Sequence, residues 1–185
     1  MVNKESLRVQ VLTASRQLFM SKGYENVGMR DIAAAVGQQP TQVYRLKLSK
    51  SDILAELILD LNNKQIAQLP KVLSKIKDES VLEKIVKYLE IQYKFDIENI
   101  ELRKVGAVHG WSWNAEYESK NFEQVLKLIH PIAQWLNEAD LDDVDSRCVG
   151  IFSLYYVGFR GAVINNFSAA ECLAAIKPSL IYFVK

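Results

Sequence analysis

A segment near the start of the chain carries side chains that can contact the edges of DNA bases. Glutamine can form two hydrogen bonds with adenine, and arginine can form two with guanine. The candidates between positions 38 and 45 are Gln38, Gln39, Thr41, Gln42 and Arg45. We predict that these side chains reach base edges.

Three further side chains near this segment suit DNA phosphates. Arg30 has a long guanidinium, and Tyr44 combines an aromatic body with a hydroxyl that can reach a phosphate oxygen. Lys50 lies where a helix is expected to begin, and free backbone N–H groups and a cation together favour a phosphate there. For each residue alone the alternative is structural, since Tyr44 can be a core residue and Lys50 a solvated surface charge.

The charge distribution supports a phosphate-binding N-terminal region. The chain has 185 residues and a net charge of only +1. Residues 1–50 nevertheless contain eight Lys and Arg residues and three acidic residues, a net charge of +5. Residues 51–185 contain 15 Lys and Arg residues and 19 acidic residues, a net charge of −4. This asymmetry is expected where one end meets phosphate and the other does not, with chance clustering as the alternative.

Three short helices are expected to position these side chains. Apolar residues recur every three or four positions over 7–19, and Gly23 follows that stretch. A second helix is predicted over 29–36, with Gly37 after it, and a third from Pro40 to about Leu46. Three short helices with a glycine between the second and third are typical of a helix-turn-helix.

The rest of the chain also shows helical periodicity, and no stretch alternates as a half-buried strand would. We therefore predict an all-α protein of about nine helices. The remaining predicted elements are a helix from Ser49 to near Pro70, a helix from Ser80 to Phe95, a less regular stretch over 99–114, a helix over 119–139 bent at Pro131, a helix over 144–167, and a last helix capped by Ser168 and interrupted by Pro178.

The helix over 144–167 is apolar on nearly all sides, which predicts burial on more than one face. Gly150, Gly158 and Gly161 would allow close backbone approach. The last helix is also very apolar. If these two helices packed against the same two helices of a second subunit, they would form a four-helix interface in a homodimer.

The order and spacing of residues over about 7–57 resemble the TetR family of bacterial transcriptional regulators. The match comprises an aliphatic–Phe pair, Gly-Tyr, a hydrophobic-Arg-x-Ile-Ala element, a turn glycine, a Tyr in the recognition helix, and Ser-Lys opening the fourth helix. Its residues are Leu18, Phe19, Gly23, Tyr24, Met29, Arg30, Asp31, Ile32, Ala33, Gly37, Val43, Tyr44, Ser49, Lys50 and Leu54. The remainder resembles the family in helix count, length and its C-terminal helix pair.

The resemblance implies a helix-turn-helix DNA-binding domain over 1–48 and a helical ligand-binding and dimerisation domain over 49–185. It implies a homodimeric repressor that binds a double-stranded DNA operator and is released by a small hydrophobic or aromatic ligand. Cys148 and Cys172 lie inside apolar helical patterns and do not form a disulfide framework, which predicts a reduced, cytoplasmic setting. The fourth helix would transmit the ligand's effect to the DNA-binding domain.

Several residues depart from the family pattern. Gln38 takes a place that is usually apolar, Gln39 replaces a Ser or Thr cap, and Gly28 stands where the family usually has Thr. The tripeptide 46–48 replaces His-Phe-x, and Leu46 or Leu48 is expected to fill the aromatic's space. The alternative function is a helical adaptor of the same fold that lost specific DNA binding and acts through protein partners.

The ligand candidates are aromatic residues and one cation in the body of the chain. The resemblance implies a cavity among the middle helices, and aromatic walls suit a flat hydrophobic ligand. We predict contacts from Trp111, Trp113, Tyr155 and Phe159, with Arg160 facing any negative group. The alternative is that the aromatics are core residues and that Arg160 meets an internal carboxylate or an interface group.

The sequence favours neither an enzyme nor a membrane protein. His109, His130, Cys148 and Cys172 lack zinc-ligand spacing, and no phosphate loop or nucleophile elbow occurs. We expect no metal, no cofactor and no catalytic residue. The uncharged stretch over 148–159 is too short for a membrane span, which needs roughly 20 apolar residues.

Overall fold

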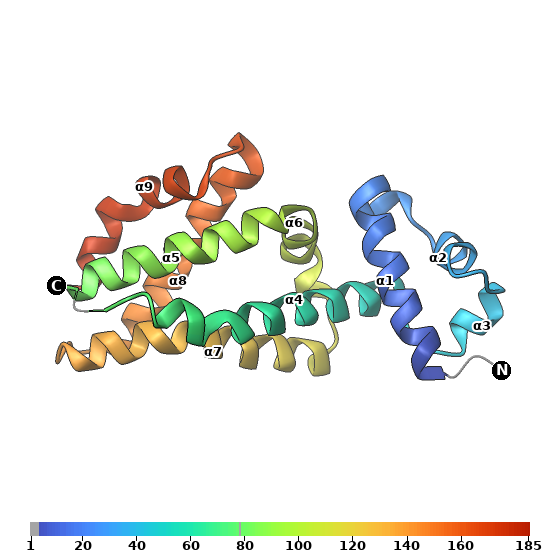
Figure 1. Ribbon diagram of the computed structural model, residues 1–185, viewed down its shortest axis with the longest axis horizontal. Coiled ribbons are helices and arrows are strands. Elements are labelled where there is room, and N and C mark those ends of the chain that lie inside the picture. Colours follow the sequence, from blue (N-terminus) through green and yellow to red (C-terminus); the bar gives the residue numbers. More distant parts are fainter. Residues whose placement is uncertain (1–3, 78) are drawn as a thin grey trace. The chain divides into compact units, whose positions relative to one another are not determined.

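The computed structural model describes residues 4–77 and 79–185, which fold into α-helices joined by turns and short 3-10 helices (Figure 1). No strand occurs in these ranges, so the predicted all-α class is confirmed. The helices are α1 (Lys4–Lys22), α2 (Met29–Ala35), α3 (Pro40–Tyr44), α4 (Lys50–Leu73), α5 (Val81–Glu98), α6 (Ile100–His109), α7 (Ala115–Glu138), α8 (Val144–Asn165) and α9 (Ala169–Leu180), with 3-10 helices η1 (Tyr24–Asn26), η2 (Gly110–Ser112) and η3 (Ile181–Phe183).

The chain forms two compact units, each with its own apolar core. The N-terminal unit comprises Met1–Asn62 and Glu101–Phe122, and the C-terminal unit comprises Asn63–Ile100 and Glu123–Lys185. Packing therefore joins a later chain segment to the first helices. The predicted functional boundary between 48 and 49 remains a prediction.

The N-terminal unit is a helix-turn-helix built on a small core. Val11, Ile32 and Val43, one from each of its first three helices, are at most 1% exposed. Gly37 has φ +63°, a conformation that glycine adopts at little cost, and it ends α2 so that α3 can begin at Pro40. The predicted order of three short helices is therefore confirmed.

At the departures over 46–48 two leucines are buried in this core. Leu46 is 6% exposed and Leu48 7%, so both leucines fill the space expected for an aromatic residue. Lys47, between them, has φ +57° and an exposed side chain. The left-handed residue lets the chain turn from α3 into α4 while both flanking leucines point inward.

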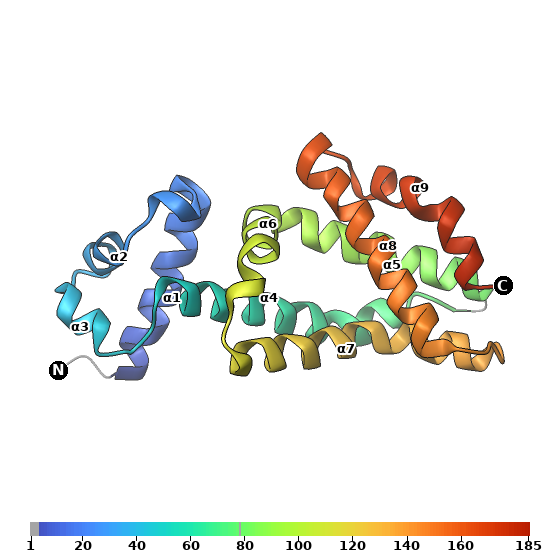
Figure 2. The same ribbon diagram turned by 180° about the vertical axis from the view of Figure 1, so that it is seen from behind.

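In the C-terminal unit, α9 lies beside α5 and α8, as both views show (Figures 1 and 2). Its core includes the fully buried Tyr93, Leu136, Ile151 and Ile176. The predicted cap of α9 is present, since Ser168 Oγ accepts from the Glu171 N–H at 3.3 Å and the Glu171 carboxylate accepts from the Ser168 N–H at 2.8 Å. Ser80 and Glu83 cap α5 in the same way.

Two expectations about helices were wrong. The stretch predicted to be irregular contains α6, which is held by tertiary packing: Leu102 is 2% exposed, and Gly106 lies against the Ile58 side chain. The last helix is not interrupted at Pro178 but continues to Leu180. Pro178 is exposed, and its missing N–H removes one hydrogen bond without ending the helix.

The glycines of α8 face their own chain. A Cβ at Gly158 would lie 2.1 Å from the Tyr93 hydroxyl, and one at Gly161 would lie 2.5 Å from the Phe167 ring. Gly150 is covered by the ring of Phe183. The glycines therefore permit close approach within the subunit, including that of the Cys172 carbonyl to Gly158 at 2.9 Å from the added Cβ, and their space is not left open for a partner helix.

The opposite face of α8 is exposed and apolar. Its members are Val149, Phe152, Tyr156, Val157, Val163 and Ile164, with Ser153 and Arg160 among them. We call these residues the outer face of α8. The helix is long and apolar enough to cross a membrane by length and composition, as core helices of folded units also are. Burial of Ile151, Phe159 and Ala162 makes it part of the C-terminal unit.

Candidate nucleic-acid interface

The side chains of α3 point outward around one buried anchor. Val43 is 1% exposed and fixes the helix on the core of the N-terminal unit. Thr41, Gln42 and Tyr44 are exposed on the same short helix. Tyr44 is 55% exposed, so its alternative role as a core residue does not fit.

The other predicted DNA contacts surround α3. Gln39 is exposed at the position before the helix and makes no side-chain capping bond, while Gln38 is half-buried. Arg45 is exposed after the helix, and its Nη1 donates to Gln42 Oε1 at 3.2 Å. Arg30 is exposed on α2, which packs against α3. The eight predicted residues therefore lie on α2, on α3 and the turns on either side of it, and at the start of α4.

Gly28 begins α2 without a side-chain cap. Its N–H donates to the Asp31 carboxylate at 2.7 Å, so the helix start is satisfied from the third helical position instead. A Cβ at Gly28 would lie 3.4 Å from that carboxylate oxygen, an ordinary contact. The departure from Thr therefore leaves the fold intact but removes a hydroxyl from the helix start.

Lys50 makes a contact inside the protein that the sequence did not indicate. Its Nζ donates to the Tyr24 carbonyl at 3.1 Å and lies 4.1 Å from the centroid of the Tyr24 ring. The alternative of a freely solvated charge is therefore excluded. An ammonium group has three donors, so donors remain for a phosphate after this bond.

A carboxylate lies near Lys50 at the start of α4. Asp52 Oδ2 accepts from the Ser49 N–H at 2.8 Å and from the Ser49 hydroxyl at 2.7 Å. This acid satisfies the helix start and brings a negative charge there. Any phosphate at this end of α4 is attracted by Lys50 and repelled by Asp52.

The turn that carries Tyr24 also meets the end of α6. His109 Nε2 lies 3.0 Å from Glu25 Oε1, and the His109 ring centroid lies 4.7 Å from that of Tyr24. Burial, and secondly the Glu25 carboxylate, raises the pKa of Tyr24. Sequence reasoning missed this cluster, since 84 positions separate Glu25 from His109 and neither belongs to a motif.

A second ionic cluster joins α1, α4 and α7 within the N-terminal unit. The nearly buried Glu56 carboxylate pairs with Arg8 and accepts from the Tyr117 hydroxyl at 2.9 Å. Burial and this hydrogen bond raise the pKa of Tyr117, so the phenol stays protonated. The cluster fixes α1 relative to α4 and so supports the surface that α3 presents.

The predicted ligand residues divide between the two units. Trp111 and Trp113 belong to the N-terminal unit, where Trp111 is 94% exposed and Trp113 packs on the core. Tyr155, Phe159 and Arg160 belong to the C-terminal unit. The structure therefore describes these five residues as two separate groups.

Tyr155 and Phe159 are occupied within the C-terminal unit. Tyr155 donates to Asp96 Oδ2 at 2.7 Å and stacks on Tyr93 with 4.3 Å between ring centroids. Phe159 is 7% exposed. Both fit the alternative of core residues, whereas Arg160 is exposed on the outer face of α8.

The C-terminal unit has surface pockets, and the five predicted ligand residues do not line the two that follow. One of about 360 Å³ is bounded by Ile66, Leu126, Lys127 and His130. The other, of about 460 Å³, is bounded by Gln68, Lys71, Val72, Lys75 and Ile91. The described part of the chain contains no group of three or more His, Cys, Asp or Glu residues placed to hold a metal ion.

Comparisons with known proteins agree with this geometry. Residues 11–57 match the family model of bacterial regulatory proteins, tetR family, and no curated protein matches the sequence. Among solved structures, the chain is similar to FadR from Bacillus subtilis in complex with stearoyl-CoA (TM-score 0.70, 18% identity, 96% of this chain and 97% of that one). It is also similar to PfmR from Thermus thermophilus (TM-score 0.66, 19% identity, 95% of this chain and 94% of that one). A tetR-family regulatory protein from Rhodococcus RHA1 is similar as well (TM-score 0.68, 18% identity, 96% of this chain and 96% of that one).

Proposed function

We propose that this chain, whose residues 11–57 match the tetR-family model, is a cytoplasmic, homodimeric repressor of the TetR family that a small-molecule ligand releases from its DNA operator. The proposal makes it a binding protein without an enzymatic reaction. The observation that carries it is the arrangement of α3, in which Val43 is buried while Thr41, Gln42 and Tyr44 are exposed. An adaptor that bound only proteins would not need such residue types on a helix-turn-helix.

The dimer is supported by the outer face of α8. Val149, Val157 and Ile164 are 59–66% exposed on one side of a single helix. Monomeric proteins rarely leave contiguous apolar patches open to water. On α9 the exposed positions include Ala170, Ala174 and Ala175, whose small side chains permit a close approach of helices.

Ligand control is proposed from the family and from the length of α4. The FadR structure contains stearoyl-CoA, which supports a ligand with an apolar part. Helix α4 begins at Lys50 and contributes residues to both units. A ligand that moved α4 would change the separation of the recognition helices, which must match a repeat of roughly 34–36 Å. It can do so only as far as it prefers the non-binding state.

A gel-shift titration with the DNA flanking the protein's own gene tests the proposal. We expect a saturable complex with the dimer that survives a large excess of unrelated DNA. The variant Tyr44→Ala should lose most of this affinity, because the exposed tyrosine would no longer contact phosphate. The matched variant Tyr182→Ala, at another highly exposed tyrosine, should bind normally.

The adaptor alternative predicts a different outcome. If the protein bound flanking and unrelated DNA equally weakly, and Tyr44→Ala changed nothing, specific operator binding would be excluded. The departures at Gly28 and Gln39 would then mark a helix-turn-helix that no longer binds a specific site.

A further inference from the structure

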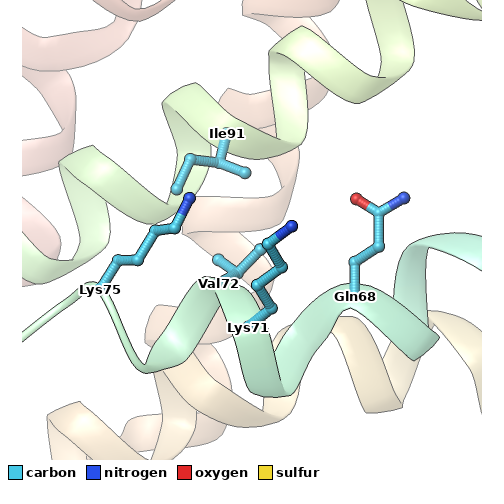
Figure 3. Close-up of a pocket in the computed structure, with 5 residues that line it drawn as sticks. All are labelled: Gln68, Lys71, Val72, Lys75 and Ile91. Atoms are coloured by element: carbon cyan, nitrogen blue, oxygen red, sulfur yellow. The ribbon is translucent and has the colours of Figure 1, made fainter.

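The second pocket combines cationic groups with an apolar floor. Gln68 and Lys71 extend from α4, and Lys75 extends from the turn after it, on the side that faces Ile91 of α5 (Figure 3). Val72, 8% exposed, and Ile91 supply the apolar surface between them. A volume of about 460 Å³ lies within the usual range of small-ligand sites.

The two lysines of this pocket differ from their neighbours on α5. Lys84 and Lys94 pair with Glu138 and Glu90 at 3.6 and 2.7 Å, and Lys87 pairs with Glu79. Within residues 4–77 and 79–185, neither Lys71 nor Lys75 forms an ion pair. Glu90, which precedes the pocket residue Ile91 on α5, is thus already paired with another cation.

Local charge reinforces this contrast. Residues 60–79 contain four lysines, at 64, 71, 75 and 77, and three acidic residues at the ends of the segment, a net +1, although residues 51–185 as a whole carry a net −4. One of the three acids, Glu79, pairs with Lys87. The end of α4 contributes roughly half a negative charge through its helix dipole. Two ammonium groups outweigh that half charge, so the pocket attracts anions.

We propose that this pocket binds a soluble organic phosphate with an apolar substituent. Lys71 and Lys75 would pair with the phosphate, Gln68 would donate a hydrogen bond from its amide, and Val72 and Ile91 would contact the apolar part. A doubly charged phosphate matches two ammonium groups, and the apolar floor favours an ester over the free ion. The site is distinct from the predicted aromatic contacts, and its existence does not depend on DNA binding.

The test is isothermal titration calorimetry on the full chain with octyl phosphate, inorganic phosphate and 1-octanol as probes. Octyl phosphate should bind on the order of tenfold or more tighter than inorganic phosphate, because part of its chain leaves water. Octanol should bind weakly, since it lacks the charge. Equal affinity for inorganic and octyl phosphate would overturn the proposal.

Variants locate the binding. The double variant Lys71→Ala, Lys75→Ala should lower the affinity for octyl phosphate by about tenfold or more. The matched pair Lys84→Ala and Lys94→Ala removes the same charge from α5 and should leave affinity unchanged. Ile91→Asn should lower the affinity for octyl phosphate toward that for inorganic phosphate, and the affinity for inorganic phosphate should not change. If both double variants lost affinity for octyl phosphate equally, the binding would come from general charge attraction, and the proposed site would be wrong.

Vesicles separate a soluble ligand from a membrane lipid. The chain should not sediment with phosphatidic acid vesicles any more than with phosphatidylcholine vesicles of the same size. Sedimentation that depended on Lys71 and Lys75 would overturn the assignment to a soluble phosphate. Thermal melting of the Lys71→Ala, Lys75→Ala variant should match the parent, since both lysines are exposed.

Discussion

Lys50 makes a contact inside the protein and is proposed to contact DNA as well. The first contact is measured by stability, and the second by the salt dependence of DNA binding. Lys50→Ala should weaken specific and unrelated DNA alike and lower the salt slope of binding by about one. It should also cost about 0.5–1 kcal/mol of stability, because the cation leaves the Tyr24 ring. Binding titrations over a salt series and urea unfolding measure the two effects.

The control for Lys50 is Lys22→Ala, which removes an exposed charge in the last turn of α1. Its DNA affinity should fall less and its stability should not change. If Lys50→Ala lowered stability but left the salt slope intact, Lys50 would serve the Tyr24 turn alone.

Gln42 is the residue for which a change in base preference is expected. Gln42→Ala should alter the preferred operator sequence while binding to unrelated DNA stays nearly constant, since base contacts specify and phosphate contacts position. Arg45, which donates to Gln42, would also be freed to take another geometry. Selection from randomised DNA measures the preference, with Gln10→Ala on α1 as control. An unchanged preferred sequence would remove Gln42 from base contact.

At the scale of the element, α9 depends on a reciprocal cap that responds to pH. The Ser168 N–H and hydroxyl lower the pKa of Glu171. A lowered carboxyl pKa stabilises the fold at neutral pH, and this contribution is lost as the pH falls through the lowered pKa. Ser168→Ala removes the hydroxyl from both side-chain bonds of the cap and should therefore lower the free energy of unfolding at neutral pH. Its deficit relative to the parent should shrink in acid.

Urea unfolding at neutral and acid pH measures that deficit, with Ser179→Ala on the same helix as the matched control. The control should show no pH-dependent difference from the parent. A deficit for Ser168→Ala that persisted unchanged in acid would show that the bond from the Ser168 hydroxyl to the Glu171 carboxylate does not contribute to stability, since the backbone N–H of residue 168 remains in the variant.

Helix starts and turns were largely predictable from the sequence, whereas contacts between distant segments were not. Ser80, Ser168, Gly37 and Pro40 act locally, so their types and spacing predict where α3, α5 and α9 begin. Helix α6 was missed because its stability comes from packing against α4. Exposed DNA-contact candidates could be inferred from a short motif.

The ligand residues could not be placed in the same way. Nothing in the sequence shows that Tyr155 is held by Asp96, or that Lys71 and Lys75 face Ile91 across a turn. These arrangements depend on which helix faces meet, and periodicity specifies a face without naming its neighbour.

At the scale of the whole molecule, the proposed dimer should depend on the outer face of α8. Val157→Glu places a charge in an apolar surface that association would bury, so the protein should become monomeric at micromolar concentration. Val108→Glu, at a comparably exposed valine of α6, should remain dimeric. Light scattering measures both. A wild-type monomer at micromolar concentration would contradict the proposed dimer.

The N-terminal unit is assembled from two separated pieces of chain, and this affects its synthesis. Leu102 of its core and Tyr117, the partner of Glu56, leave the ribosome long after the first three helices. Those helices can form early, yet their unit is complete only when Phe122 has emerged. A fragment ending at Asn62 would leave the Glu56 carboxylate without its phenol and the core without α6. A nascent chain would therefore acquire its full set of core contacts late, after most of the polypeptide had been translated.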